Sequence, residues 1–490
     1  MNKVIIELKD AVALNPVWRL NSPINFSLCE GENILVVGRN GAGKSMLINT
    51  ILGNYPLRDG SRDYFFDGYS SNHMYDNVKY LAFNDNGSVS DYYQQRWNSF
   101  DQEDAIMVDS VLAEYGDKEY LAQLLKVLNI EHVVGKKLLS LSNGELRKLQ
   151  IIKTLVSKPA VLIIDNPYIG LDIKSRASLE NLFSALSRNL KTSLIIVQSR
   201  LYNIPDFITH VVSVKDMCYL PKITVQEYLK NYSPESFDDK ELLEKKVLSL
   251  PYNPIEDNSD EIVNLNNVTV RYGDEILLRD LSWNVRKGQK WALLGDNGSG
   301  KSTLLSLICA DNPQGYACDM RLFGRKRGSG ESIWEIKKRI GYVSPEMYRS
   351  YLLDYTVLEV VASGLSDFVG LFKEPDKSQI EICMMWLDLF GIKDLADKSF
   401  LRISSGEQRI ALLTRAFVKD PELLILDEPL HGLDAVNCQI VRTIIEAFCD
   451  RPNKTLIMVT HYPEELPTSI TNSLTLRYGD KSEEKSFIDN

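Results

Sequence analysis

The sequence predicts an α/β fold that occurs twice, with a mixed, mostly parallel β-sheet and flanking helices in each half. Three observations support this prediction. Short apolar runs alternate with helical segments, a Gly-rich phosphate-binding motif occurs twice, and the motifs that follow it recur at a nearly constant separation. A chain of 490 residues is also too long for a single hydrophobic core, which indicates at least two domains.

Two segments match the phosphate-loop pattern G-x-x-x-x-G-K-[ST], and each lies between an apolar strand-like run and an apolar helical segment. Glycines let backbone N–H groups point at phosphate oxygens, and the positive end of the following helix dipole favours the same anion. We therefore predict two nucleotide-binding loops. The first comprises Gly38, Arg39, Asn40, Gly41, Ala42, Gly43, Lys44 and Ser45, and the second comprises Gly295, Asp296, Asn297, Gly298, Ser299, Gly300, Lys301, Ser302 and Thr303.

Each loop carries a lysine that is expected to reach the β- and γ-phosphates and a serine that is expected to ligate Mg²⁺. Two aspartates each end an apolar strand-like run, at the sheet edge where the phosphate loops are also expected. A carboxylate at that edge can orient the metal shell. The predicted metal-site residues are Ser45, Asp165, Ser302 and Asp427, and the predicted cofactors are ATP and Mg²⁺.

The spacing of these motifs identifies a repeat of domain size. Lys44 and Lys301 are separated by 257 positions, whereas the strand-ending aspartates Asp165 and Asp427 are separated by 262. The second copy therefore contains a small insertion, after its phosphate loop. We predict a first domain at 2–232, an acidic linker at 233–260 and a second domain at 261–490, each domain with a helical subdomain inserted into its α/β core.

The complete motif set resembles that of the ATP-binding-cassette (ABC) ATPases. Besides the phosphate loops, it includes Leu-Ser-Asn-Gly-Glu in the first half, Ile-Ser-Ser-Gly-Glu in the second, and Gly-Leu-Asp in both. The resemblance covers nearly the whole chain and implies two P-loop NTPase cassettes in tandem. In this family two cassettes pair head to tail, and each ATP lies between one phosphate loop and the opposite signature. The pairing within this chain would place Ser404 and Gly406 at the first site, and Ser142 and Gly144 at the second.

The catalytic residues that the resemblance implies are complete only in the second half. Glu428 follows the strand-ending aspartate and would accept a proton from the attacking water, whereas the matching Asn166 carries an amide that cannot act as a base. His461, the family's γ-phosphate contact, is matched by Ser199. We predict that Glu428 and His461 are catalytic and that the first site binds ATP with slow or no turnover. The alternative is that the first half binds no nucleotide.

An aromatic residue for adenine stacking is also expected in only one half. Tyr272 lies 23 residues before Gly295, where the family places this aromatic ring, so Tyr272 is a predicted nucleotide-binding residue. The same count back from Gly38 gives Asn15, and the nearby Trp18 is out of register.

Both halves depart from the family at the strand that leads into the helical subdomain. The family usually has a glutamine there, which contacts Mg²⁺ and faces membrane partners, but the segments 80–85 and 341–346 contain none. Gln94 and Gln95 come later in the first half. The segments 312–316, 322–331 and 333–338 nevertheless resemble the molybdate-transport (ModF, or photorepair) type of tandem ABC ATPase.

Composition places this chain in a reducing compartment. Seven cysteines form no Cys-x-x-Cys pair, the amino-terminal segment is charged, and no apolar stretch is long enough to span a membrane. We predict a cytoplasmic protein without membrane insertion, with peripheral attachment at the inner face of the cell membrane if it serves a permease. The net charge of −10 argues against a general nucleic-acid partner.

Three functions remain open from the sequence. The leading one is the soluble ATPase component of an ABC importer, of the molybdate type by resemblance, which docks onto separate membrane permease subunits. The second is a cytosolic ATPase that acts on a macromolecule, although the acidic linker opposes contact with a phosphate backbone. The third is a nucleotide-sensing regulator in which the first site holds ATP.

Overall fold

The chain forms two compact units, Met1–Glu235 and Ser236–Asn490. The predicted boundaries at 232, 233 and 260 stay a prediction. The computed structural model describes residues 3–66, 73–83, 107–113, 115, 117–128, 130–138, 141, 143–169, 171–189, 192–201, 203–232, 237–251, 259–273, 275–345, 347, 351, 353–366, 374–477 and 483–486.

The first unit contains a seven-stranded sheet with the order β10-β8-β3-β7-β6-β5, to which β9 adds by pairing with β8. All pairs among β8, β3, β7, β6 and β5 are parallel, and β10 and β9 pair antiparallel with β8. The bounds are β3 Ile34–Val37, β5 Val78–Ala82, β6 Val161–Asp165, β7 Ser193–Gln198, β8 His210–Lys215, β9 Cys218–Tyr219 and β10 Ile223–Thr224.

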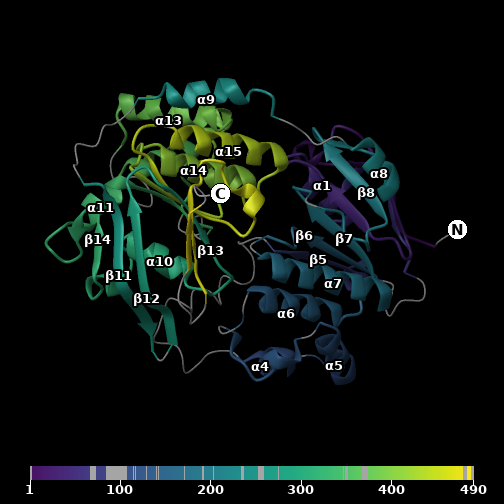
Figure 1. Cartoon of the computed structure of the whole chain (residues 1–490). Helices are drawn as coiled ribbons and strands as arrows, with labels where there is room; N and C mark the ends of the chain where they lie inside the picture. Colours follow the sequence, from purple (N-terminus) through teal and green to yellow (C-terminus); the bar gives the residue numbers. More distant parts are fainter. Residues whose placement is uncertain are drawn as a thin grey trace. The chain divides into compact units, whose positions relative to one another are not determined.

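Two hydrophobic cores lie on the two faces of this sheet. The central strands are continuous apolar runs because both of their faces are covered. On one face, Ile34 and Val36 pack with helix α1 (Lys44–Ile51) and with a small antiparallel sheet, β2-β1-β4. On the other face lie α6 and α7 (Figure 1). Further bounds are β1 Val4–Ala13, β2 Ile24–Cys29, β4 Leu57–Tyr64, α2 Met74–Asn77, α4 Val108–Ala113, α5 Lys118–Val127, α6 Asn143–Leu155, α7 Ile173–Asn189, α8 Val225–Asn231 and the short helices η1 Pro16–Trp18 and η2 Glu131–Val133.

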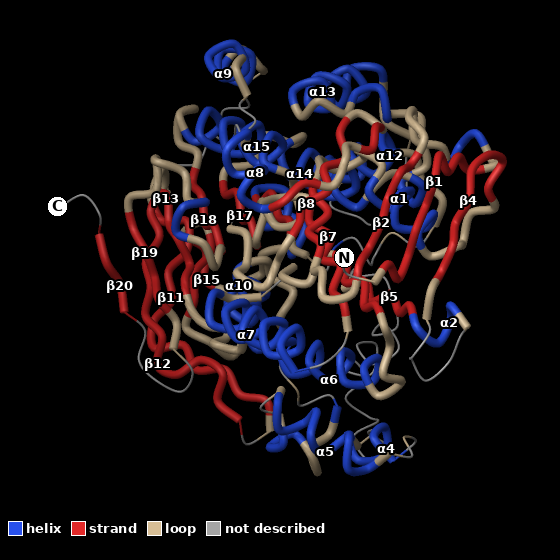
Figure 2. Tube along the Cα trace, turned by 90° about the vertical axis from the view of Figure 1, so that its right-hand side faces the viewer, coloured by secondary structure: helices blue, strands red, loops and turns tan. Residues whose placement is uncertain are grey.

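The second unit repeats this plan. Its main sheet has the order β16-β17-β18-β13-β19-β20, parallel except for the pair β19/β20, which forms one edge (Figure 2). An antiparallel sheet, β12-β11-β14-β15, packs beside it. The strand bounds are β11 Glu261–Tyr272, β12 Glu275–Arg286, β13 Lys290–Leu294, β14 Met320–Leu322, β15 Arg325–Lys326, β16 Ile340–Val343, β17 Leu423–Asp427, β18 Thr455–Val459, β19 Asn472–Thr475 and β20 Glu483–Ser486.

Helices between the phosphate loop and the second half of each sheet form the inserted subdomain, α4 and α5 in one unit and α12 and α13 in the other. The predicted α/β fold with two such insertions is confirmed. None of the helices in the described ranges combines the length and the apolar character that crossing a bilayer requires. The remaining bounds are α9 Lys240–Leu248, α10 Lys301–Ile308, α11 Ile333–Arg339, α12 Val357–Ala362, α13 Lys377–Leu389, α14 Ser405–Phe417, α15 Ala435–Cys449, η4 Pro313–Tyr316, η6 Ser363–Leu365, η7 Lys393–Leu395, η8 Phe400–Arg402 and η9 Pro463–Glu465.

Part of the predicted linker is a helix that belongs to the second unit. Helix α9 lies beside α13 and α15 (Figure 1), where its Leu243 and Val247 are buried in their common core. These two residues are four positions apart and therefore share one helix face. Arg451 then holds the end of the segment, donating to the carbonyl oxygens of Leu250 and Pro251 at 3.1 and 2.7 Å.

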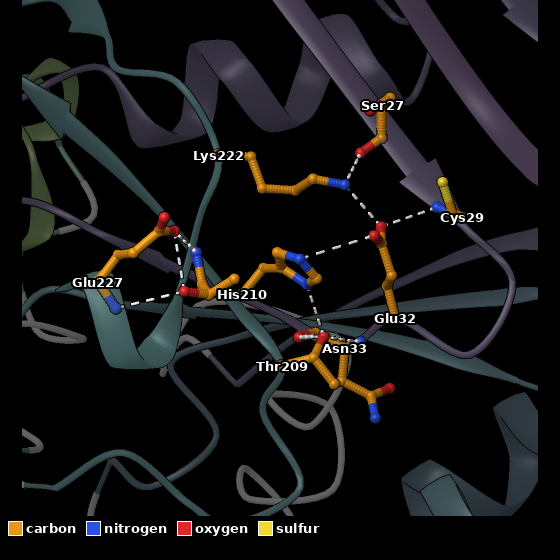
Figure 3. Close-up of polar contacts among 9 residues, drawn as sticks. Ser27, Cys29, Glu32, Asn33, Thr209, His210, Lys222 and Glu227 are labelled. Carbon is orange, nitrogen blue, oxygen red and sulfur yellow. Dashed lines mark hydrogen bonds and ion pairs between the residues drawn. The ribbon is translucent and has the colours of Figure 1, made fainter. Parts of the chain in front are cut away.

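A charged cluster fastens the last elements of the first unit to its sheet (Figure 3). Lys222 lies just before β10, and its Nζ is 2.6 Å from Oε2 of Glu32, which precedes β3. The imidazole of His210 on β8 lies 3.8 Å from the other oxygen of Glu32 and 2.9 Å from the Thr209 hydroxyl. Glu227 completes the cluster as part of the capping box of α8.

Replacing His210 by asparagine is expected to flatten the pH dependence of stability of the first unit. Burial lowers the pKa of His210 below its ordinary 6.5, and Glu32 only partly opposes this effect. The unfolded chain therefore takes up the proton first, so the histidine makes the protein less stable as pH falls below about 6.5. Asn472 occupies the equivalent position, opposite Trp291 on β13, as His210 is opposite Ile34 on β3. Urea unfolding between pH 5 and 8 measures this slope, and an unchanged slope contradicts the assignment.

Candidate functional site

The two phosphate loops share their backbone conformation at the second and third glycines of the motif. Gly43 and Gly300 precede α1 and α10 with φ angles of 102° and 94°, and Gly41 and Gly298 have φ angles of 76° and 81°. These values lie in the left-handed region, which glycine adopts at little cost. An added Cβ at Gly43 would lie 2.5 Å from a terminal methyl group of Leu20, which can move aside, so it is the φ angle that favours glycine there. Both loops thus have the form that the sequence predicts.

The lysine of each phosphate loop contacts the backbone of its own loop. Lys44 is largely buried, and its ammonium group donates two hydrogen bonds to loop carbonyls, as does that of Lys301. The equivalent bonds run from Lys44 to Gly38 (2.8 Å) and Arg39 (2.8 Å), and from Lys301 to Gly295 (2.7 Å) and Asp296 (2.9 Å).

The second loop also contains a donor that fits an anion. The hydroxyl oxygen of Ser299 is buried and has no hydrogen-bond partner among the described residues. A phosphate oxygen in the loop would satisfy it, because a buried polar atom without a partner is unfavourable. The loop therefore suits the nucleotide phosphates that its sequence predicts.

Asp165 lies at the carboxyl end of β6, near the first phosphate loop. Its two oxygens accept hydrogen bonds from the Tyr80 hydroxyl at 3.0 Å and from the Asn166 amide at 2.9 Å. Burial raises the pKa of Asp165 above its ordinary value, and Tyr80 and Lys44 only partly oppose this effect. Additional positive charge would favour the ionised carboxylate, which fits a divalent cation at this edge.

Asp427, the second predicted metal-site aspartate, lies at the equivalent position in the second unit. Asp427 ends β17 and pairs with Val459 of β18, as Asp165 pairs with Val197. Within the described ranges no group of three His, Cys, Asp or Glu side chains could hold a metal ion by itself. Ser45 and Ser302 are the second residues of α1 and α10, directly after the loop lysines, and their role as Mg²⁺ ligands stays a prediction.

Glu428 lies in the turn after β17 with its carboxylate held by two histidines. Its Oε1 is 3.1 Å from Nε2 of His461, and its Oε2 is 3.1 Å from Nδ1 of His431. Burial alone would raise the pKa of Glu428, but the contacts with His431 and His461 outweigh it and hold the pKa well below its ordinary value. The carboxylate is therefore ionised near neutral pH, as a general base must be.

Asn166 has the same backbone geometry as Glu428 but a different side-chain contact. Both residues have φ of 50°, and each donates its N–H to the neighbouring strand at 2.9 Å, to Val197 O and Val459 O respectively. The Asn166 amide, however, donates to Asp165 within its own unit. Asparagine accepts the left-handed conformation more readily than glutamate does. The first unit therefore keeps the turn and lacks the base.

The signature of the second unit is a helix N-terminus. Ser404 caps α14, forming a reciprocal capping box with Glu407, and Gly406 is buried in the first turn. In the first unit Gly144 lies in α6, whereas Ser142 lies outside the described residues. The opposed pairing of each signature with the other phosphate loop stays a prediction.

The two units are more alike near the predicted adenine-stacking position than the residue count indicates. Tyr272 is about half exposed, and its hydroxyl accepts a hydrogen bond from Asn312, the residue before Pro313, at 3.0 Å. In the first unit Trp18 stacks on Tyr55, which has the same place before Pro56, with ring centroids 4.6 Å apart.

Counting along the sequence selects Asn15 instead of Trp18 because the two hairpins differ. Tyr272 pairs directly with Glu275 in a tight turn, whereas β1 and β2 are joined through η1. The Asn15 side chain caps η1 by accepting from Val17 N. Trp18 and Tyr55 therefore form a stacked aromatic pair in the first unit, and adenine stacking in either unit stays a prediction.

The glutamine that the family usually has is missing directly after both β5 and β16, as the sequence already showed. Phe83, after β5, is buried, and Ser344 follows β16. Gln94 and Gln95 lie outside the described residues. His431 is the residue that sequence reasoning missed. The sequence feature that could have revealed this contact is the histidine three positions after the predicted base, Glu428.

Comparisons with known proteins identify the family of this chain. Residues 21–169 and 278–431 match the model of the family described as ABC transporter. The chain is similar to the ABC transporter ATP-binding protein ModF of Escherichia coli, with 36% identity over 92% of each chain. It is also similar to an uncharacterized ABC transporter ATP-binding protein of Schizosaccharomyces pombe, with 29% identity over 95% of this chain and 96% of that protein.

Solved structures show the same fold. The archaeal ribosome recycling factor aABCE1, solved in complex with the ribosomal stalk protein aP1, has a TM-score of 0.56 and 18% identity over 97% of this chain and 89% of that one. A structure of an RNase-L inhibitor gives the same TM-score, identity and coverage. The two matched segments, the two phosphate loops and the ModF similarity together show that the chain belongs to the ABC ATPases, with two cassettes in tandem.

Proposed function

We propose that this ATPase hydrolyses ATP at the site that contains Lys301, Asp427 and Glu428, while the site that contains Lys44 binds ATP and turns over slowly or not at all. The observation that carries the proposal is the difference between Glu428 and Asn166 on the same turn. The glutamate is an ionised carboxylate held by two histidines, whereas Asn166 is a neutral amide bonded to Asp165.

Hydrolysis requires a proton acceptor and compensation of negative charge. The Glu428 carboxylate accepts a proton as a water oxygen bonds to the γ-phosphorus and the bond to the β-phosphate oxygen breaks, giving ADP and phosphate. Lys301 and the loop N–H groups stabilise the charge on the phosphates, and His461 contacts the γ-phosphate. Mg²⁺, for which Ser302 and Asp427 are the proposed holders, would neutralise charge on the β- and γ-phosphates.

The cellular role we propose is that of ATPase subunit for separate membrane permease subunits, of the molybdate type by resemblance. The similarity to ModF over nearly the full length supports an association with an ABC transport system. The alternative is an ATPase that acts on a cytosolic macromolecular or regulatory partner. The lack of a glutamine directly after β5 and β16 favours that alternative, because this glutamine contacts the membrane partner in the family.

Affinity purification with Glu428→Gln separates these two roles, because this variant is expected to hold ATP and any partner bound to the ATP form. Membrane and soluble fractions are purified in parallel with ATP present, with a Glu428→Gln/Lys301→Ala variant as the control that lacks the lysine for the phosphates. Enrichment of a permease only with intact Lys301 supports the transport role. Enrichment of a soluble macromolecule, with no permease, contradicts it.

A further inference from the structure

We propose that His431 is a positioning residue for ATP hydrolysis, which fixes the second carboxylate oxygen of Glu428 so that the first can face the attacking water. The inference rests on the proposed role of Glu428 as the base. It assigns a function to a residue that lies outside the phosphate loops, the signature and the metal site.

Two histidine rings contact the Glu428 carboxylate. One comes from the turn after β17 and the other from the residues after β18. His431 lies three residues after Glu428 in the same turn, and its N–H donates to the Glu428 carbonyl at 3.2 Å. Its Nδ1 lies 3.1 Å from Oε2 of Glu428, while His461, two residues after β18, lies 3.1 Å from Oε1. The side chains of Glu428 and His431 are 17% and 15% exposed, so solvent competes weakly with this contact.

The orientation of the Glu428 carboxylate must be fixed by contacts with other side chains. The terminal torsion of a glutamate is broad and roughly two-fold, so an unanchored carboxylate rotates easily. With one histidine beside each oxygen, the orientation of the carboxylate plane is defined.

The first cassette provides an internal comparison. Ile169 and Ser199 occupy the positions that match His431 and His461, as Asn166 matches Glu428. The turn itself is the same, because Ile169 N donates to Asn166 O at 3.3 Å. The turn therefore forms without a histidine at this position. Both histidines occur in the cassette that has the glutamate, and neither occurs in the cassette that has asparagine. We therefore infer that His431 orients the carboxylate and is not needed to form the turn.

The test compares His431→Leu and His431→Ala, which remove the ring nitrogen, with His431→Asn, whose amide nitrogen can take the place of Nδ1. We expect kcat for ATP hydrolysis to fall roughly 10- to 100-fold in the first two, as for a misplaced catalytic group, with KM for ATP changed less than about twofold. The asparagine variant is expected to recover most of kcat. ATP binding and the unfolding temperature, measured for each variant, show that the cassette is folded.

Combination with Glu428→Gln separates this inference from the proposed function. In the Glu428→Gln background, His431→Leu is expected to lower kcat no further, because the two residues act as a unit. If Glu428→Gln abolishes hydrolysis while His431→Leu and His431→Ala keep the wild-type kcat, the positioning role is wrong and the base assignment stands. A loss that His431→Asn does not restore also overturns the role. If Glu428→Gln keeps the wild-type kcat, the base assignment itself fails.

Discussion

Replacing Glu428 by glutamine is expected to lower the steady-state kcat of ATP hydrolysis about 100- to 10,000-fold, the usual contribution of a general base. Glutamine has the shape of glutamate but cannot accept the proton from water. Affinity for ATP should remain, because the phosphate loop with Lys301 is unchanged. Phosphate release measures kcat, and equilibrium binding of ATP shows that the site is intact.

The matched control is Asn166→Gly in the first cassette. Glycine accommodates the φ of 50° at this position, so the backbone turn is kept while the amide is removed. We expect kcat to change less than about threefold, because Asn166 supplies no base in the proposed mechanism. A large loss of hydrolysis in this variant, or wild-type hydrolysis in Glu428→Gln, would reverse the assignment of the two sites.

Replacing Asp420 by asparagine is expected to destabilise the second unit by about 3 kcal/mol, the low end of the range for breaking a buried charge pair. Asp420 is the shared partner of Arg451 and Lys454, each at 2.8 Å, and all three side chains are at most 6% exposed. Loss of its charge leaves two buried cations. Asparagine tolerates the left-handed φ of 54° at this position, so the effect reports the charge rather than the backbone.

Calorimetry of the full chain measures this effect. For a unit of this size, about 3 kcal/mol corresponds to a decrease in Tm of roughly 6–12 °C. Asp388→Asn is the control, because Asp388 pairs with Lys393 at an exposed site, with side chains 50% and 52% exposed, where an ion pair contributes about 0–1 kcal/mol. Equal Tm changes in the two variants would show that the buried pairs of Asp420 stabilise the second unit no more than an exposed ion pair does.

The buried charges around Asp420 also fix the end of the segment that contains α9. Arg451 bonds to Asp420 and also to the carbonyl oxygens of Leu250 and Pro251. The end of the α9 segment is therefore held by the same buried charges that stabilise the second unit. From composition alone, this acidic segment is predicted to be a linker. Its apolar residues Leu243 and Val247 are surrounded by charged residues in the sequence, so composition does not reveal that they are buried.

The fold and most of the site were predictable from the sequence because their signals are local. A phosphate loop is a contiguous motif whose glycines require particular φ angles, and the strands behind it are uninterrupted apolar runs. The aspartates and Glu428 follow such strands directly. The repeat also shows, without coordinates, which positions correspond in the two halves.

The parts that sequence reasoning missed depend on contacts between segments. The role of His431 appears only when the turn brings its ring to the oxygen opposite His461. The stacked pair of Trp18 depends on the length of the connection between β1 and β2 and on Tyr55, more than thirty positions away. Neither relation follows from counting residues back from a phosphate loop.

The measurement that tests the unequal sites most directly is the identity of the nucleotides retained by each chain. The protein is loaded with Mg²⁺ and ATP, excess nucleotide is removed rapidly, and bound ATP and ADP are counted in the wild type, Glu428→Gln, Lys44→Ala and Lys301→Ala. We predict about one ATP and one ADP per wild-type chain, only ATP in Glu428→Gln, and no ADP without Lys301. Two ADP per wild-type chain, or ADP formed by Glu428→Gln, would contradict the account.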